Sequence, residues 1–203
     1  SSMVFSIFGA DPSIWSVNSR SEVLRGDARN VTIDSTGAIS LSPKLTEVYK
    51  TAQPYIWSSA IDANSNVYLG TGGDGKIFKV TAAGAGSLFA DLAEMNVTAV
   101  ALGQNGDLFA ATSPDGKVYK IDAAGRSSVY FDAKEKYIWS LAVMNDGSLA
   151  VGTGESGKIY MVKAANAAPD ASLLFDTSDS HIITLVVDKA GNLSSDLAPI
   201  LVN

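Results

Sequence analysis

The sequence predicts an all-β protein built from repeated four-stranded units. A Gly–Lys turn occurs three times at intervals of 41 residues, with its lysines at Lys76, Lys117 and Lys158. Between these turns, short apolar runs alternate with segments rich in Gly, Asn and Asp, a pattern typical of short strands. The sequence shows no helical apolar period of useful length. Because a fixed period indicates repeated architecture rather than a single site, these observations define the fold class.

Composition excludes several classes of function. The chain has 203 residues, of which 46% are hydrophobic and 18% charged, which is typical of a globular protein. Its net charge of -6 argues against nucleic acid or an anionic membrane as the main partner. The absence of cysteine excludes disulfides, thiolate metal sites and cysteine nucleophiles. No apolar run approaches the roughly 18 to 20 residues of a spanning helix, and both an exported and a cytoplasmic location stay open.

The first part of the chain predicts short elements that differ from the later repeats. Residues 1–26 contain two apolar runs, Met3–Phe8 and Ile14–Val17, which we interpret as closing strands. Residues 27–54 form a short unit with strands at 30–34 and 38–41 and a further short strand at Leu45–Lys50. Terminal repeats are often atypical in this way.

Three complete units follow, at 55–95, 96–136 and 137–180. The first has predicted strands at Tyr55–Asp62, Val67–Thr71, Lys76–Thr81 and Ser87–Leu92, and the other two repeat this order. A partial unit, 181–203, begins like the others but has Ser194–Pro199 where the Gly–Lys turn should be. Four short strands separated by tight turns predict the blade of a β-propeller.

The segment Tyr137–Gly154, with the sequence YIWSLAVMNDGSLAVGTG, resembles the repeats of bacterial β-propellers. It is similar to the regulator-propeller repeats of two-component sensors, and more loosely to WD40-like, NHL and quinoprotein repeats. The resemblance extends roughly from Asp27 to Leu193. It implies a propeller fold but no single function, because such repeats serve unrelated tasks. The sequence lacks the Trp-Asp dipeptide, and no tryptophan closes each repeat.

One short, three full and one partial unit predict about five blades in a single domain, 1–203. We expect a closed ring in which Met3–Phe8 pairs with Pro199–Val202 or its neighbours, because an open blade edge favours aggregation. The alternative is an incomplete or truncated part of a larger propeller.

The candidate site follows from aligning the repeats. The first residues of the predicted inner strands coincide; they are Asp27, Tyr55, Asn96, Tyr137 and His181. This position lies near one mouth of a propeller channel, and Trp57 and Trp139 follow two residues later. These seven residues are the predicted ligand-binding set, suited to a small polar ligand such as a carbohydrate, or to a protein or peptide. The alternative is that both tryptophans pack between blades.

The Gly–Lys turn resembles a phosphate-binding loop only in its spacing. Ile77 follows Lys76, so the magnesium-binding hydroxyl is missing, and a strand rather than a helix comes next. Asp74 would also repel a phosphate. We therefore predict hairpin turns with solvated lysines, and with positive φ at Gly75, Gly116 and Gly157.

Two other patterns were weighed as chemical sites. Asp62–Asn66 resembles the start of a calcium loop but lacks the required glycine, so it predicts a polar turn. His181 is the only histidine and could pair with Asp176 or Asp188, but it cannot form a multi-histidine metal site. We predict no metal, no cofactor and no catalytic residues.

The sequence therefore favours a non-catalytic β-propeller scaffold that binds its ligand at the channel mouth. One alternative is a propeller hydrolase or lyase that uses Asp27 and His181 at the same mouth. Another is a structural module of a larger sensor or surface protein. The oligomeric state stays open.

Overall fold

The structure is a computed structural model that describes residues 16, 19–23, 25–26, 29–164, 169–177, 180–195 and 199–200. The chain divides into two compact units, Ser1–Glu47 and Val48–Asn203. The predicted closing strand Met3–Phe8 lies outside the described residues, as does Ile14–Val17 apart from Ser16. Closure of a ring by these segments, and a single domain over 1–203, therefore stay predictions.

The first unit contains α1 (Arg20–Val23) and a hairpin of β1 (Val31–Ile33) and β2 (Ile39–Leu41). The short helix was not predicted, because one turn is too short to show a period. It begins with a capping box, in which the Ser19 backbone N–H donates to the Glu22 carboxylate at 3.1 Å and the Glu22 N–H donates to Ser19 Oγ at 3.4 Å. In the described part of the chain, no helix is long and apolar enough to cross a bilayer.

The predicted strand at Leu45–Lys50 is wrong, because these residues pair with no strand in the described part of the chain. Val48–Lys50 instead belong to the second unit. There Tyr49 packs against Phe78 with 6.0 Å between the ring centroids.

The second unit contains three four-stranded antiparallel blades and a partial one. Blade A consists of β3 (Tyr55–Ile61), β4 (Val67–Gly72), β5 (Lys76–Val80) and β6 (Gly86–Asp91). Blade B consists of β7 (Asn96–Leu102), β8 (Leu108–Ser113), β9 (Lys117–Ile121) and β10 (Ser127–Asp132). Blade C consists of β11 (Ile138–Val143), β12 (Leu149–Thr153), β13 (Lys158–Lys163) and β14 (Asp170–Asp176). Blade D has β15 (Leu185–Val187), β16 (Leu193–Ser195) and β17 (Pro199–Ile200).

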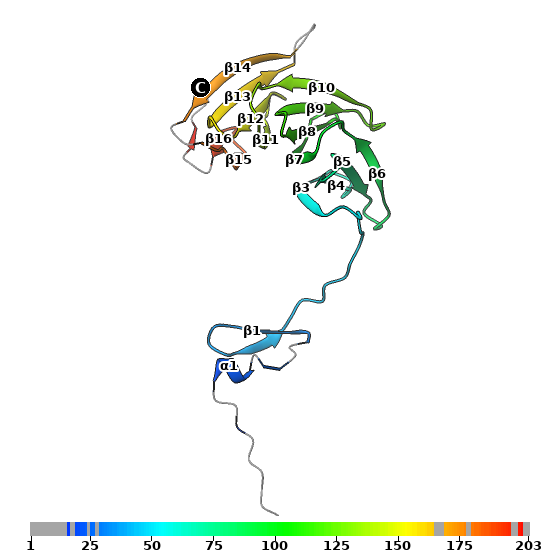
Figure 1. The fold of residues 1–203 in the computed structure, drawn as a ribbon, viewed down its shortest axis with the longest axis vertical. Helices are drawn as coiled ribbons and strands as arrows, with labels where there is room; N and C mark the ends of the chain where they lie inside the picture. The colour runs from blue at the N-terminus through cyan, green and yellow to red at the C-terminus, as the bar shows by residue number, and fades with distance from the viewer. Residues whose placement is uncertain are drawn as a thin grey trace, which may run out of the picture. The chain divides into compact units, whose positions relative to one another are not determined.

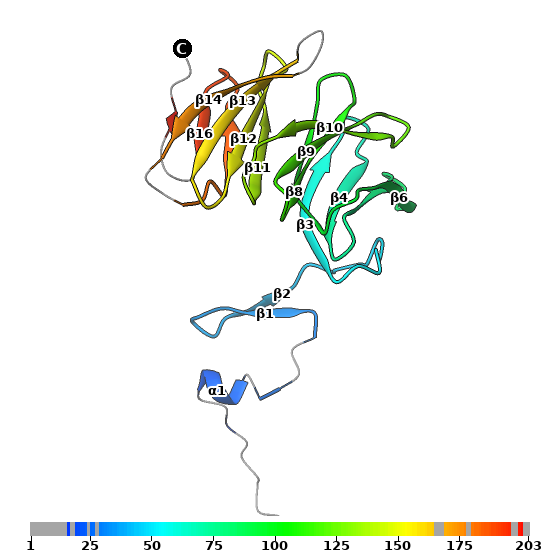
Figure 2. The ribbon, with the colours of Figure 1, turned by 45° about the horizontal axis from the view of Figure 1, so that its top comes forward.

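The blades of this unit follow one another along an arc (Figure 1). The first strands of the blades lie on its inner side and the last strands β6, β10 and β14 on its outer side, and Figure 2 shows the same blades turned by 45°. The prediction of four-stranded antiparallel blades at 55–95, 96–136 and 137–180 agrees with the observed pairing.

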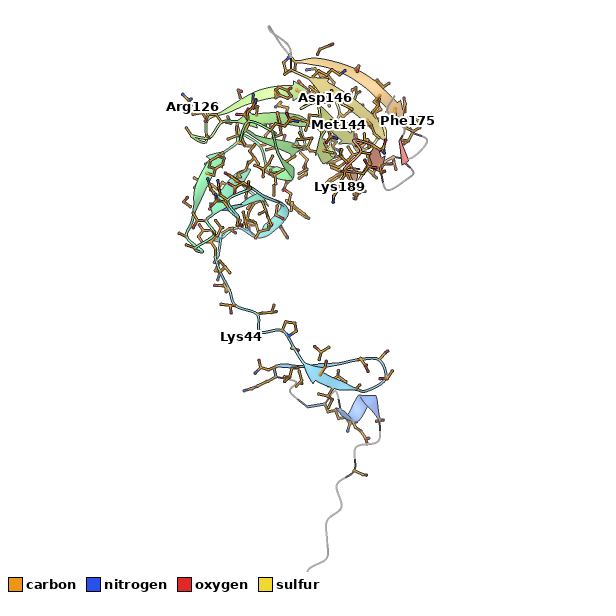
Figure 3. The ribbon with its side chains drawn as sticks, turned by 180° about the vertical axis from the view of Figure 1, so that it is seen from behind. Lys44, Arg126, Met144, Asp146, Phe175 and Lys189 are labelled. Carbon is orange, nitrogen blue, oxygen red and sulfur yellow. The ribbon has the colours of Figure 1, made fainter. Side chains whose placement is uncertain are left out.

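The apolar core lies between successive blades. Three clusters join A to B, B to C and C to D, and Met144, labelled in Figure 3, belongs to the third. Val97, Ile138 and Ile182 hold the same repeat position and are each 0% exposed, because each packs against the preceding blade. Ile56 holds that position in blade A and is 53% exposed, since the described residues of this unit contain no earlier blade.

The Gly–Lys turns are hairpins, as predicted. The φ angles of Gly75, Gly116 and Gly157 are 61°, 52° and 55°, which confirms the predicted positive values. Each hairpin is also held by a buried threonine whose hydroxyl donates to the backbone carbonyl of the turn lysine. These bonds run from Thr71, Thr112 and Thr153 at 2.8, 3.1 and 3.1 Å.

Candidate functional site

A β-bulge interrupts the inner strand of blades A, B and C at the same repeat position. The pairing shifts between Ile56 and Ser58 in β3, between Val97 and Ala99 in β7, and between Ile138 and Ser140 in β11. The residues skipped by the ladder are Trp57, Thr98 and Trp139. A bulge redirects a side chain out of the regular alternation of a strand. The tryptophans singled out from the sequence therefore lie at the points where the backbone is redirected.

The two tryptophans have matching surroundings. The Trp57 ring stacks on Tyr55 with 5.2 Å between centroids, and the Trp139 ring stacks on Tyr137 at the same distance. Each indole also contacts the next blade. Trp57 Nε1 donates to Asn96 Oδ1 at 3.3 Å. The structure thus repeats one arrangement, a Tyr–Trp stack whose indole N–H reaches the neighbouring inner strand.

The second indole N–H is bound by the only histidine. Trp139 Nε1 donates to His181 Nδ1 at 3.3 Å, and the Glu155 backbone N–H donates to the same nitrogen at 3.3 Å. With Nδ1 as the acceptor, the neutral His181 ring carries its proton on Nε2. The imidazole lies edge-on to Trp139, with 6.3 Å between ring centroids.

The inner strands enclose a cavity of about 440 Å³. Four of its lining residues share the bulged repeat position; they are Trp57, Thr98, Trp139 and, from blade D, Ile183. Asn96, Ser113 and Tyr137 complete the lining, and none of these seven described side chains carries a charge. The volume lies within the roughly 300 to 1,000 Å³ of small-molecule sites.

Four of the seven predicted residues, Trp57, Asn96, Tyr137 and Trp139, line this cavity. The other predicted residues do not. Tyr55 stacks on Trp57 and is 57% exposed, and His181 supports Trp139 by the hydrogen bond described above. Asp27 lies outside the described residues.

Sequence reasoning missed three lining residues. Thr98 and Ile183 occupy the repeat position of the two tryptophans, so the same alignment could have identified them. Ser113 lies at the end of β8, the second strand of its blade. Its proximity to the inner strand follows from the pairing of Asn96 with Ser113, and no spacing in the sequence indicates it.

Both interpretations of the tryptophans describe part of the structure. Each indole bridges two blades, as expected for packing between blades, yet Trp57 is 55% exposed and both rings line the cavity. A glycine makes the close approach possible. A Cβ added to Gly72 would lie 2.2 Å from Trp57 Nε1, and one on Gly154 would lie 2.4 Å from Trp139 Nε1.

The turn lysines differ from the solvated side chains that the sequence predicts. Lys117 Nζ lies 2.9 Å from Glu94 Oε1, and Lys158 Nζ lies 2.8 Å from Glu135 Oε1, in the segments between blades. The Glu94 hydrogen bond is the largest cause of the raised pKa of Lys117. Burial, followed by the hydrogen bond to the same carboxylate, raises the pKa of Tyr119 to about 12. These lysines therefore connect blades, which suits architecture better than anion binding.

The acidic turn at Asp62 has the geometry of a polar turn. Asp62 Oδ1 accepts the backbone N–H of Asn64 at 2.9 Å and that of Asn66 at 2.8 Å. The side-chain hydrogen bond from Asn66 is the largest cause of its lowered pKa. Asp188 makes the same bonds to Ala190 and Asn192, so its carboxylate is engaged in its own turn. In the described part of the chain, no group of three or more His, Cys, Asp or Glu side chains could hold a metal ion.

The geometry matches propellers of known structure. Virginiamycin B lyase from Staphylococcus aureus superposes with a TM-score of 0.63 at 16% identity, over 81% of this chain and 55% of that chain. The fold is a partial β-propeller. A gluconolactonase from Xanthomonas campestris gives 0.59 at 18% identity, over 68% of this chain and 54% of that one. A structure of the nidogen–laminin complex gives 0.63 at 14% identity, over 81% and 64%.

The chain spans about 55% of the length of the first of these structures. The matched proteins include six-bladed propellers, so the described blades correspond to the incomplete propeller that the sequence left open, while five-bladed closure stays a prediction. No protein-family model matches the sequence, and no curated protein matches it. Identities below 20% establish the fold alone, and that fold is shared by lyases, lactonases and binding scaffolds.

Proposed function

We propose that this chain is a non-catalytic binding module that holds a small, partly polar ligand, or a protein segment, in the cavity between Trp57 and Trp139. The observation that carries the proposal is the uncharged, aromatic-walled cavity at the inner-strand bulges. Rigid aromatic faces supply contact area at a low cost in side-chain entropy, and a few polar groups then orient the ligand.

The polar groups of the cavity suit recognition better than bond cleavage. Asn96 Oδ1 accepts the Trp57 N–H, which directs the Asn96 amide N–H₂ group elsewhere as a donor. His181, the residue that the hydrolase or lyase hypothesis needs, uses Nδ1 to accept two N–H groups rather than to bond a carboxylate. The resemblance to sensor-type repeats supports a recognition role within a larger protein in the same way.

Isothermal titration calorimetry with neutral monosaccharides, indole and blocked tripeptides tests the proposal. We expect at least one probe to bind, and Tyr137→Ala or Trp139→Ala to weaken its binding by tenfold or more. Such a loss is typical of buried aromatic anchors. Circular dichroism should show that both variants stay folded.

Phe175→Ala is the matched control, because Phe175 is an exposed aromatic residue (49%) on the outer strand β14 (Figure 3). It should bind like the wild type. Unchanged affinity in Trp139→Ala for every probe that binds would remove the cavity as the binding site.

A further inference from the structure

We propose that the cavity receives a flat heteroaromatic ring with an N–H on its edge, and that this ring takes the place that a tryptophan takes in blades A and C. The inference deepens the proposed function and rests on it. It follows from a set of concerted differences in blade B.

Blade B differs from its neighbours at four aligned positions. Thr98 stands where blades A and C have Trp57 and Trp139. The other three replacements are Ala99 for Ser58 and Ser140, Ala111 for Gly70 and Gly152, and Ser113 for Gly72 and Gly154. Substitutions at single positions would be ordinary variation in a repeat. Here the four positions contact one another in pairs, so the differences have a common structural cause.

The first pair is the bulged residue and the end of the second strand. In blades A and C the indole lies so close to Gly72 or Gly154 that a Cβ would approach Nε1 within 2.4 Å. A serine at this position is possible in blade B because Thr98 leaves the space free. Ser113 therefore fits only the blade that lacks the tryptophan.

The second pair preserves a hydrogen bond between blades. Ser140 Oγ donates to the Ile182 carbonyl at 2.8 Å, and a Cβ on Gly152 would lie 2.3 Å from that Oγ. In blade B, Ala99 has no hydroxyl, and Thr98 Oγ1 donates to the equivalent Ile138 carbonyl instead. Blade B thus keeps the inter-blade bond without a tryptophan, and Ala111 is accommodated.

The vacated position is part of the cavity. In blades A and C the indole stacks on the first residue of its own blade and directs its N–H at the first residue of the next. In blade B those two residues are Asn96 and Tyr137, and both line the cavity with Thr98 and Ser113 below. A ring bound there would lie over Asn96 with its edge toward Tyr137, between the walls of Trp57 and Trp139.

A flat ring fits this cavity better than a sugar. The polar groups of the walls are largely engaged, since the N–H groups of Trp57 and Trp139 and the Thr98 hydroxyl already donate within the protein. A sugar would bury several hydroxyls and would need a partner for each of them. A heteroaromatic ring buries mainly apolar faces and needs one acceptor for its edge N–H. The uncharged lining favours a neutral ring.

Calorimetric titration with indole, N-acetyltryptophanamide and methyl glucoside tests this proposal. The decisive variant is T98W/A99S/A111G/S113G, which gives blade B the residues of blades A and C. We expect the wild type to bind at least one of the two indole compounds, and the fourfold variant to bind it at least tenfold more weakly because its own indole fills the site. The stronger of the two compounds indicates whether the ring comes from a free small molecule or a peptide side chain.

A99S/A111G is the matched control, because it changes the second pair and leaves the cavity open, so it should bind as the wild type does. If the fourfold variant fails to fold, nuclear Overhauser contacts from bound indole to the methyl groups of Thr98 and Ile183 replace it. Their absence, equal binding by a folded fourfold variant, or no binding of either indole compound would overturn the ring.

The two proposals fail differently. If methyl glucoside alone binds and the fourfold variant loses it, the ring is wrong and the binding module stands. If some probe binds and neither the fourfold variant nor Trp139→Ala weakens it, both proposals fail.

Discussion

The Gly–Lys hairpins and the inner-strand bulges are both repeated in blades A, B and C, but they repeat in different ways. The hairpins keep the same residues and bonds, with Thr, Gly and Lys at equivalent positions in all three blades. The bulges keep the backbone but change the side chain, from Trp57 to Thr98 to Trp139. A position that is constant within a repeat serves every blade and is architectural. A position that varies while its backbone is kept is free to serve a single site on the axis.

The largest expected effect comes from breaking a hairpin at Gly116. Its φ is +52°, and an added Cβ would lie 1.8 Å from the Glu135 carbonyl oxygen. Gly116→Ala should lower the free energy of unfolding by about 3 kcal/mol, from left-handed strain plus the backbone clash. Urea unfolding followed by circular dichroism measures the loss.

Gly106→Ala separates the two causes, because Gly106 has a φ of +78° and nothing within 4 Å of an added Cβ. It should cost about 1 kcal/mol, from conformation alone. Equal losses in the two variants would show that the contact with the segment between blades contributes nothing.

A smaller effect is expected at Thr112, whose side chain is 0% exposed. Its hydroxyl donates to the Lys117 carbonyl at 3.1 Å and accepts the Lys117 N–H at 3.3 Å. Thr112→Val keeps the shape but leaves these groups with a lost partner, so it should cost about 1 to 2 kcal/mol in urea unfolding. Thr112→Ser retains the hydroxyl and should recover most of that stability; a serine variant as unstable as the valine one would argue against the hydrogen bond.

The sequence predicted the blades well because the period, the turn glycines and the alternating apolar residues are local signals. It also placed Tyr137 and Trp139 at one end of an inner strand, since aligned repeat positions converge near an axis. It could not predict Ser113, whose part in the cavity depends on pairing between β7 and β8. It also misjudged Lys117, because its partner Glu94 is 23 residues away and reaches it only once the blades pack. What the sequence lacked in both cases was the contact between elements that are distant along the chain.

The most direct test of a binding site at the bulges is a pair of ¹H–¹⁵N NMR spectra recorded with and without indole. We predict that the indole N–H signals of Trp57 and Trp139 both shift on titration, while the backbone amide of Phe175 on the outer strand keeps its position. Shifts confined to residues outside the cavity, with both tryptophan signals unchanged at saturation, would contradict a site between the two tryptophans.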